Sequence, residues 1–148
     1  MGLFDKVLGK KDEGPLKLNQ HEAFSSICVL AVASDGVVDD GEIRRIVGVL
    51  AEKRLFKGYG VNDMAQLLNN AGRNIQRRGA GVVLESAKAA LPNELKETAF
   101  AMATDLVLSD GDVADKEKAF LEEFQKALGI DDGLALKIVE VMALKNRG

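Results

Sequence analysis

A nine-residue segment occurs twice in this sequence, and it constrains the fold more than any other feature. Residues 34–42 and 109–117 lie 75 positions apart and are identical at six of nine positions. The shared pattern is S-D-G-x-V-x-D-x-E, and the match extends in character to Ile46 and Leu121. A pattern repeated at a fixed offset indicates a duplicated structural unit. We therefore expect two helix-loop-helix units, an arrangement that often has a pseudo-twofold axis.

The periodicity of the apolar residues predicts an all-α fold. Apolar residues recur at three- and four-residue steps, whereas alternating β-branched runs bounded by turns are almost absent. Asn19 with Glu22 has the spacing of a capping box. The sequence thus predicts a compact bundle of about seven helices. They are expected from Asn19 to near Ser34, from Asp39 through Leu55 to the glycines at 58 and 60, from 62 to 78, from 82 to 91, from Pro92 to 108, from 115 to 128, and from 132 to 145 after an Asp131 cap.

The length of the chain fits one domain with an N-terminal extension. A chain of 148 residues can bury one continuous core without disulfides or metals. Residues 1–18 are expected to be an amphipathic segment and linker, and residues 19–148 the helical domain. The apolar stripe of the N-terminal segment predicts docking on its own domain, on a partner or on a membrane surface. It consists of Leu3, Phe4, Val7 and Leu8.

Composition excludes several classes of protein. No apolar run approaches the ~18 residues of a membrane-spanning helix, and the N-terminus lacks the features of a signal peptide, so a cytoplasmic location is expected. Cys28 is the single cysteine and lies in an apolar run, which predicts an unreactive core thiol. His21 is the single histidine and has no partner ligand at metal-binding spacing, so it is predicted to be a surface residue.

The charges of the chain are unevenly distributed. Seven Lys or Arg and two acidic residues between Lys53 and Lys88 give a local charge of +5, which leaves −8 for the rest of a chain of net charge −3. A solvated helix face is the simplest explanation of this basic block. Because the total is negative and aromatic residues are few, nucleic-acid binding is not expected.

Each repeated loop has a simple structural explanation. Gly36 and Gly111 can adopt the positive φ that ends a helix sharply. Val38 and Val113 can then pack between the two helices of each unit. The carboxylates that follow would lie in the first turn of the next helix, where they satisfy free N–H groups. Ala114 lacks the capping side chain that Asp39 provides in the first loop.

The number of carboxylates exceeds what capping requires. Clustered carboxylates on a turn are typical ligands of calcium or magnesium. Neither loop is an EF-hand, because Ile46 and Leu121 stand where the bidentate glutamate would be. Three interpretations remain open: a divalent metal site, a bare acidic docking patch, and purely structural caps. The candidate metal ligands are Asp35, Asp39, Asp40, Glu42, Asp110, Asp112, Asp115 and Glu117.

The motif between the helices resembles that of the TerB-like tellurite-resistance family. The pattern A-x-x-S/A-D-G-x-V-x-x-x-E extends from Leu30 to Glu42 and recurs near residues 108–117, and the N-terminal residues 2–7 are also similar. The resemblance covers roughly residues 19–145. It implies an all-α fold, acidic residues proposed to bind metal, and a stress-response assembly at the inner face of the bacterial membrane. The implied partners are TerC-like membrane proteins and TerD-like calcium-binding proteins.

The leading hypothesis is a non-enzymatic, metal-responsive adaptor in resistance to tellurite and related chemical stress. The rival is a metal-independent acidic scaffold that docks a basic protein partner, with binding sensitive to salt and indifferent to chelators. A magnesium-dependent hydrolase is the third hypothesis. Against it, the sequence has no Ser/His or Cys/His arrangement, no phosphate-binding glycine loop and no His-based metal site.

Overall fold

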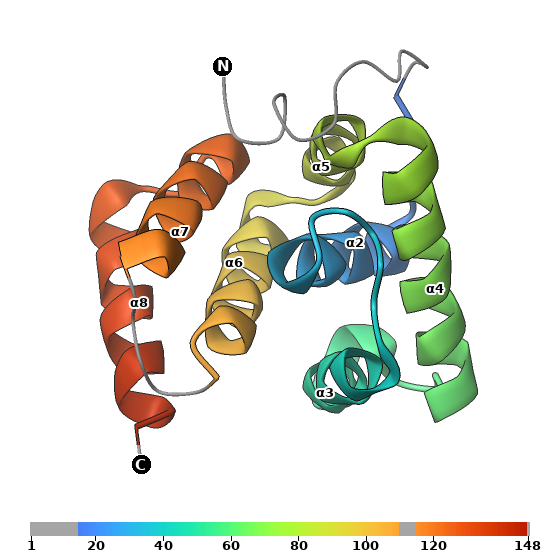
Figure 1. The fold of residues 1–148 in the computed structure, drawn as a ribbon, viewed down its shortest axis with the longest axis horizontal. Coiled ribbons are helices and arrows are strands. Elements are labelled where there is room, and N and C mark those ends of the chain that lie inside the picture. The colour runs from blue at the N-terminus through green and yellow to red at the C-terminus, as the bar shows by residue number, and fades with distance from the viewer. Residues whose placement is uncertain (1–14, 110–114, 148) are drawn as a thin grey trace.

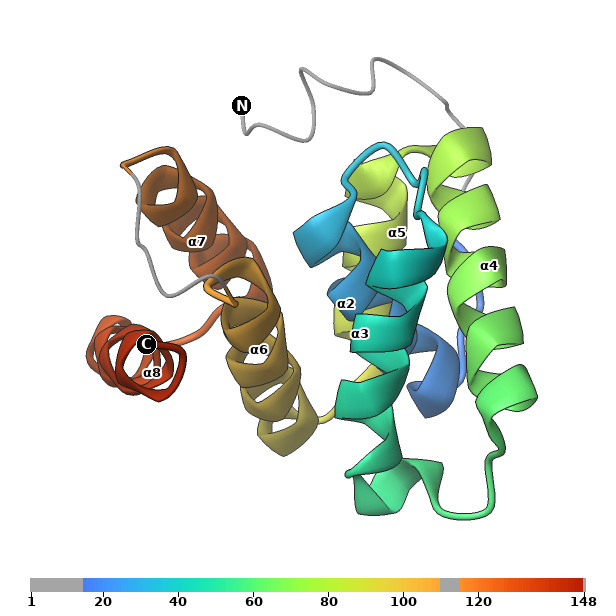
Figure 2. The same cartoon turned by 60° about the horizontal axis from the view of Figure 1, so that its bottom comes forward.

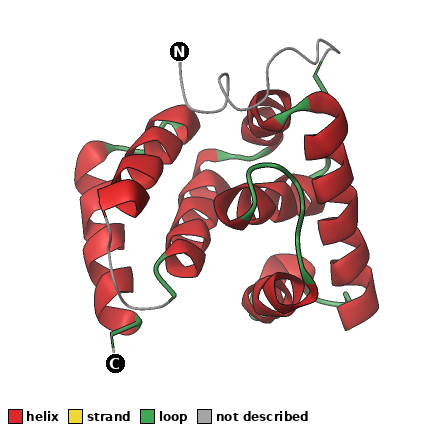
Figure 3. Ribbon diagram, in the orientation of Figure 1, coloured by secondary structure: helices red, strands yellow, loops and turns green. Residues whose placement is uncertain are grey.

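The computed structural model describes residues 15–109 and 115–147, and every regular element in this part of the chain is helical (Figure 3). The predicted all-α fold is therefore confirmed, with seven α-helices and one short 3₁₀ helix among the described residues (Figure 1). The duplication into two units stays a prediction. The elements are α2 (Gln20–Val32), α3 (Asp40–Ala51), the 3₁₀ helix η1 (Arg54–Phe56), α4 (Val61–Arg78), α5 (Ala80–Ala90), α6 (Asn93–Val107), α7 (Asp115–Leu128) and α8 (Asp132–Lys145).

Helix α2 lies at the centre of the fold and packs against α4, α5 and α6 (Figures 1 and 2). All residues from 23 to 30 are buried, as expected of a helix that is apolar on most sides. Burial of a large apolar side chain stabilises a fold by roughly 1.5–3 kcal/mol, so Phe24, Ile27 and Leu30 are major contributors. Cys28 is fully buried here, which confirms the predicted core thiol.

Helices α6, α7 and α8 form the other part of the bundle. Helix α6 packs against α2 and also against α7 and α8, and Figure 2 shows it between α2 and the last two helices. The contacts are made by buried side chains that include Phe100 of α6, Phe124 of α7 and Ala135 of α8. Helix α6 therefore joins the two parts through one continuous core.

The predicted helix starts are confirmed where side chains cap them. Asn19 Oδ1 accepts a hydrogen bond from Glu22 N at 2.8 Å, and Glu22 Oε1 accepts one from Asn19 N at 2.8 Å. Asp131 Oδ2 accepts a hydrogen bond from the first turn of α8 at 3.1 Å. Pro92 differs slightly from the prediction, since its ψ of 161° makes it the N-cap of α6 rather than a residue of its first turn.

The predicted helix from Asp39 through Leu55 is too long. Helix α3 ends at Ala51, and Lys53 has an extended ψ of 138° before the 3₁₀ helix η1 begins. This break allows Phe56 to turn into the core, where it is 3% exposed and its ring centroid lies 6.0 Å from that of Phe24. Burial of Phe56 therefore decides where the helix ends, a tertiary effect that periodicity does not contain.

The prediction of a surface position for His21 is also wrong. His21 is half-buried, and its Nε2 atom lies 2.8 Å from the carbonyl oxygen of Leu55. Its ring stacks on Tyr59 with 4.7 Å between the centroids and meets the edge of Phe56. The histidine thus ties the start of α2 to the segment around η1.

The chain that enters α2 is attached to the domain. Leu16 N donates a hydrogen bond to Ser86 Oγ of α5 at 2.9 Å, and Leu16 and Leu18 both pack against the core. Part of the predicted linker therefore contributes to the packing of the helical domain. The predicted apolar stripe at residues 3–8 lies outside the described residues.

Candidate functional site

The first acidic loop connects α2 to α3 and is folded by its own side chains. Asp35 Oδ1 accepts a hydrogen bond from Val37 N at 3.0 Å, which closes a local turn. Gly36 has the predicted positive φ, at +83°, and its N–H donates to Ala33 O at 2.9 Å. Val38 packs against the core.

The loop lies directly against α4 through two glycines. Gly36 and Gly72 are both buried, and a Cβ atom added to Gly72 would come within 2.5 Å of the Gly36 carbonyl oxygen. Figure 1 shows the loop passing between α2 and α4. The second glycine was not identified from the sequence, because a single glycine inside a helical pattern has several explanations. Together the two glycines fix the position of the acidic loop on the bundle.

Two of the four carboxylates in the first loop form the capping box of α3. Asp39 Oδ1 accepts from Glu42 N at 2.7 Å, and Glu42 Oε1 accepts from Asp39 N at 3.0 Å. Asp35 closes the turn described above, and Asp40 is exposed in the first turn of the helix. The predicted structural role of these residues is therefore present, and it leaves Asp40 without a role in capping α3.

The second acidic loop is described only in part. Ser109 precedes it, and Asp115 and Glu117 lie in the first turn of α7, as predicted. Asp115 is exposed and Glu117 is half-buried. Asp110, Asp112 and the rest of residues 110–114 lie outside the described part of the chain.

Residues from both repeated segments line one cleft of about 520 Å³. Two predicted metal ligands, Glu42 and Glu117, are among these lining residues, whereas Asp35, Asp39, Asp40 and Asp115 are not. Ten of the eleven lining residues form five pairs separated by the 75-residue offset of the sequence repeat, and Leu30 is the eleventh. The pairs are Ala31 with Leu106, Val32 with Val107, Ser34 with Ser109, Glu42 with Glu117, and Arg45 with Phe120.

A hydrogen bond joins two of the residues that line this cleft. Arg45 Nη1 of α3 donates to Ser109 Oγ, which follows the end of α6. The bond links the helix that follows the first repeated segment to the first residue of the second segment. Arg45 and the apolar lining residues Val32, Val107 and Phe120 were missed in the sequence, although the identity of Val32 and Val107 at the repeat offset was a usable signal.

The donor atoms in the cleft suit a hard cation. The carboxylates of Glu42 and Glu117 and the hydroxyls of Ser34 and Ser109 are oxygen ligands of the kind that calcium and magnesium take. Within residues 15–109 and 115–147, however, no group of three or more His, Cys, Asp or Glu could hold a metal ion. The metal site therefore stays a prediction.

The single cysteine and the single histidine of the chain, Cys28 and His21, are held in structural roles. Burial of Cys28 raises the pKa of its thiol from 9.0 to about 12, so the nucleophilic thiolate does not form near neutral pH. The imidazole of His21 is bonded to a backbone carbonyl and packed between rings. The cleft contains neither residue.

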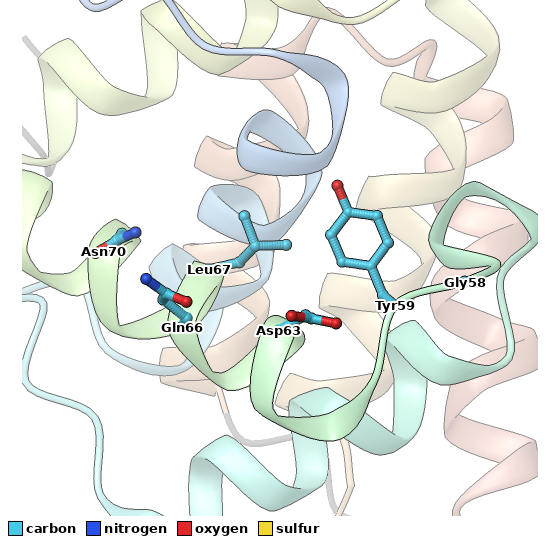
Figure 4. A pocket seen from close by; sticks show the side chains of 6 residues that line it. All are labelled: Gly58, Tyr59, Asp63, Gln66, Leu67 and Asn70. Carbon is cyan, nitrogen blue, oxygen red and sulfur yellow. The ribbon is translucent and has the colours of Figure 1, made fainter.

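A second, shallower pocket lies on the first half of α4. It has a volume of about 340 Å³, and Figure 4 shows Tyr59 and Leu67 beside the polar side chains of Asp63, Gln66 and Asn70. Asp63 caps α4, because its Oδ2 atom accepts from Gly60 N at 2.9 Å. None of the predicted site residues lines this pocket, so it provides a reference surface away from both acidic loops.

The described residues define an all-helical protein in which side chains of the preceding segments cap α2, α3 and α8. A family model described as tellurite resistance protein TerB matches residues 21–137. The chain therefore belongs to the TerB family, whose members are non-catalytic helical domains, and this membership indicates a role in tellurite resistance. Searches of curated proteins and of solved structures found no significant match. Among the described residues, no helix is both long and apolar enough to cross a membrane.

Proposed function

We propose that this protein is a non-enzymatic, cation-responsive adaptor in resistance to tellurite and related chemical stress. A divalent cation, calcium or magnesium, binds between the two acidic loops and alters the surface that a protein partner recognises. The proposal is supported by one observation above all: Glu42 and Glu117, which are equivalent in the two repeated segments, line the same cleft.

The number of ligands that a hard cation requires favours participation of both loops. Calcium takes roughly six to eight oxygen ligands and magnesium about six, with water completing the shell. A single loop has too few side chains for this, because Asp35, Asp39 and Glu42 each use one carboxylate oxygen to accept a backbone hydrogen bond and keep only the other oxygen for a cation. Asp40 and the carboxylates of the second loop, Asp110, Asp112, Asp115 and Glu117, are the candidates for the further ligands.

Calorimetric titration of chelator-treated protein with calcium, magnesium, manganese and zinc tests the proposal. We compare the wild type with two double variants, Asp35→Asn with Asp110→Asn and Glu42→Gln with Glu117→Gln. Asparagine and glutamine keep an acceptor oxygen for the hydrogen bonds of Asp35 and Glu42 while removing the charge. The folded loop is therefore expected to survive in each variant.

The matched control is Asp63→Asn with Asp131→Asn, which removes two capping carboxylates away from the cleft. Saturable heat with one ion should be lost in both acidic-loop variants and retained in this control. Absence of heat with every ion, or equal loss in the control, would contradict the proposal.

The alternative function is a metal-independent acidic scaffold that docks a basic partner. It is favoured by the capping box of α3, because Asp39 and Glu42 have a structural role without any ion. Its binding would weaken as salt rises and would be indifferent to chelators, whereas the adaptor would lose binding in chelator.

TerC-like membrane proteins and TerD-like calcium-binding proteins are the proposed partners, which would bring the protein to the inner face of the membrane.

A further inference from the structure

The cleft between the two repeated segments has apolar lining residues that the binding of a cation does not explain. Six of its eleven lining residues are apolar: Leu30, Ala31, Val32, Leu106, Val107 and Phe120. Coordination of calcium or magnesium uses oxygen atoms only. These apolar residues therefore require an explanation of their own.

Three of these apolar side chains come from three different helices and are partly open to solvent. Val32 ends α2, Val107 ends α6 and Phe120 lies in α7, and each is half-buried while packed against the core. An apolar cleft rimmed by polar groups is typical of a site that receives a ligand. Its volume of about 520 Å³ falls within the roughly 300–1,000 Å³ of such sites.

The charged residues of the cleft define the chemistry of the ligand that would bind there. Two carboxylates, Glu42 and Glu117, and one guanidinium, Arg45, give the lining a net charge of −1. The hydrogen bond of Arg45 goes to the neutral hydroxyl of Ser109. Exposed Asp39 and Asp40, at the start of α3, add negative charge on that side, and exposed Arg44 offsets one of these charges.

We infer that the cleft is a docking site for a segment of a protein partner that inserts one large apolar side chain beside a lysine or arginine. The apolar side chain of the partner contacts Val32, Val107 and Phe120. The basic group of the partner lies near Glu42 and Glu117. This inference rests on the proposed function, because it assigns the partner-binding surface to the same cleft.

Short blocked dipeptides test the inference by amide chemical-shift mapping of the full-length protein labelled with ¹⁵N. The probe is N-acetyl-Phe-Arg-amide, and the matched probes are N-acetyl-Phe-Glu-amide and N-acetyl-Gly-Arg-amide. The first should give saturable shifts at residues 30–34, 42–45 and 106–109, with an affinity at least about tenfold higher than either matched probe. Equal affinity for the Glu probe, or shifts located elsewhere, would overturn the inference.

Two variants separate charge recognition from folding. Glu42→Gln keeps the acceptor oxygen of the capping box and should reduce the preference for Arg over Glu severalfold. Asp63→Asn removes a capping carboxylate outside the cleft and should leave that preference unchanged. An equal effect of the two variants would contradict recognition of the arginine by Glu42 in the cleft.

Parallel titrations in chelator and in calcium distinguish this inference from the proposed function. Dipeptide binding in both solutions, together with no heat from any cation, would support the docking site and refute cation response. Cation binding that depends on Glu42 and Glu117, with no saturable dipeptide shift, would support the proposed function and overturn the docking site.

Discussion

Gly36 and Gly72 meet backbone to backbone, so that neither has room for a side chain. Gly36 is at φ +83° in the first acidic loop, and Gly72 lies in the middle of α4. A Cβ atom on Gly72 would lie 2.5 Å from Gly36 O and 3.7 Å from Val38 Cγ2. The acidic loop is therefore positioned by a helix that carries none of the predicted ligands.

Substitution of Gly72 by alanine should destabilise the protein. The new methyl group would meet backbone atoms, which yield less readily than a flexible side chain, and overpacking of this kind costs about 1–3 kcal/mol. Gly48→Ala is the control, since Gly48 is an exposed residue of α3 with no atom within 4 Å of an added Cβ. That change should stabilise by roughly 0.5–1 kcal/mol. Urea unfolding of both variants measures the difference, and similar stabilities would contradict the close approach.

Removal of the cap at Asp39 should weaken the start of α3. Asp39→Ala loses the acceptor for Glu42 N and should lower the free energy of unfolding by about 1 kcal/mol. Asp39→Asn keeps an acceptor and should lie within a few tenths of a kcal/mol of the wild type. Equilibrium unfolding in urea checks both values, and equal losses in the two variants would show that charge rather than capping matters there.

Cys28 should react with thiol reagents only when the protein opens. The thiol is fully buried, and burial raises its pKa to about 12. Labelling by an aromatic disulfide near pH 8 should therefore be slow in the native state and fast in urea. Rapid stoichiometric labelling of the native protein would contradict the buried position.

The same burial predicts a loss of stability at high pH. The pKa of Cys28 is raised in the folded state to about 12, above 9.0 for the ordinary thiol, so the unfolded state releases its proton first as pH rises. The contribution of the thiol is complete below pH 9.0 and is lost between pH 9.0 and about 12. The stability advantage of the wild type over Cys28→Ala should shrink in this window by at most roughly 1.4 kcal/mol per pH unit. A constant advantage across that window would contradict the prediction.

The tie between His21 and Leu55 should contribute to stability. His21→Ala removes a hydrogen bond of 2.8 Å and the ring contacts with Phe56 and Tyr59. We expect a loss of about 1–3 kcal/mol, which is typical when a partly buried polar contact and its packing are removed together. Thermal unfolding followed by circular dichroism measures this loss of stability. An unchanged unfolding midpoint would contradict the tie and favour the surface position that the sequence predicts for His21.

Local signals were enough to predict most helices. Asn19 and Asp131 cap as expected, and the observed bounds of α7 and α8 agree with the predicted ranges. The failures came from contacts that are distant in sequence. Phe56 ends α3 early because it packs against Phe24, and His21 is covered by residues from the segment around η1.

The candidate site was predicted less completely than the fold. The repeat identified Glu42 and Glu117, because first-turn carboxylates follow a loop at a fixed spacing. It could not indicate that Arg45 reaches Ser109, since that contact depends on how α3 and α6 pack. The glycine of α4 was equally hidden, because its role depends on the approach of another backbone.

Paramagnetic line broadening by manganese tests the central claim most directly, because it reports where a cation binds. Manganese is added in small amounts to the ¹⁵N-labelled, chelator-treated protein, and the amide signals are compared before and after. The account predicts selective broadening at Ser34, Glu42, Ser109 and Glu117, which is reversed by excess calcium or magnesium. Broadening that is uniform over the exposed carboxylates, or centred on Asp63 and Asp131, would contradict a cation site between the two acidic loops.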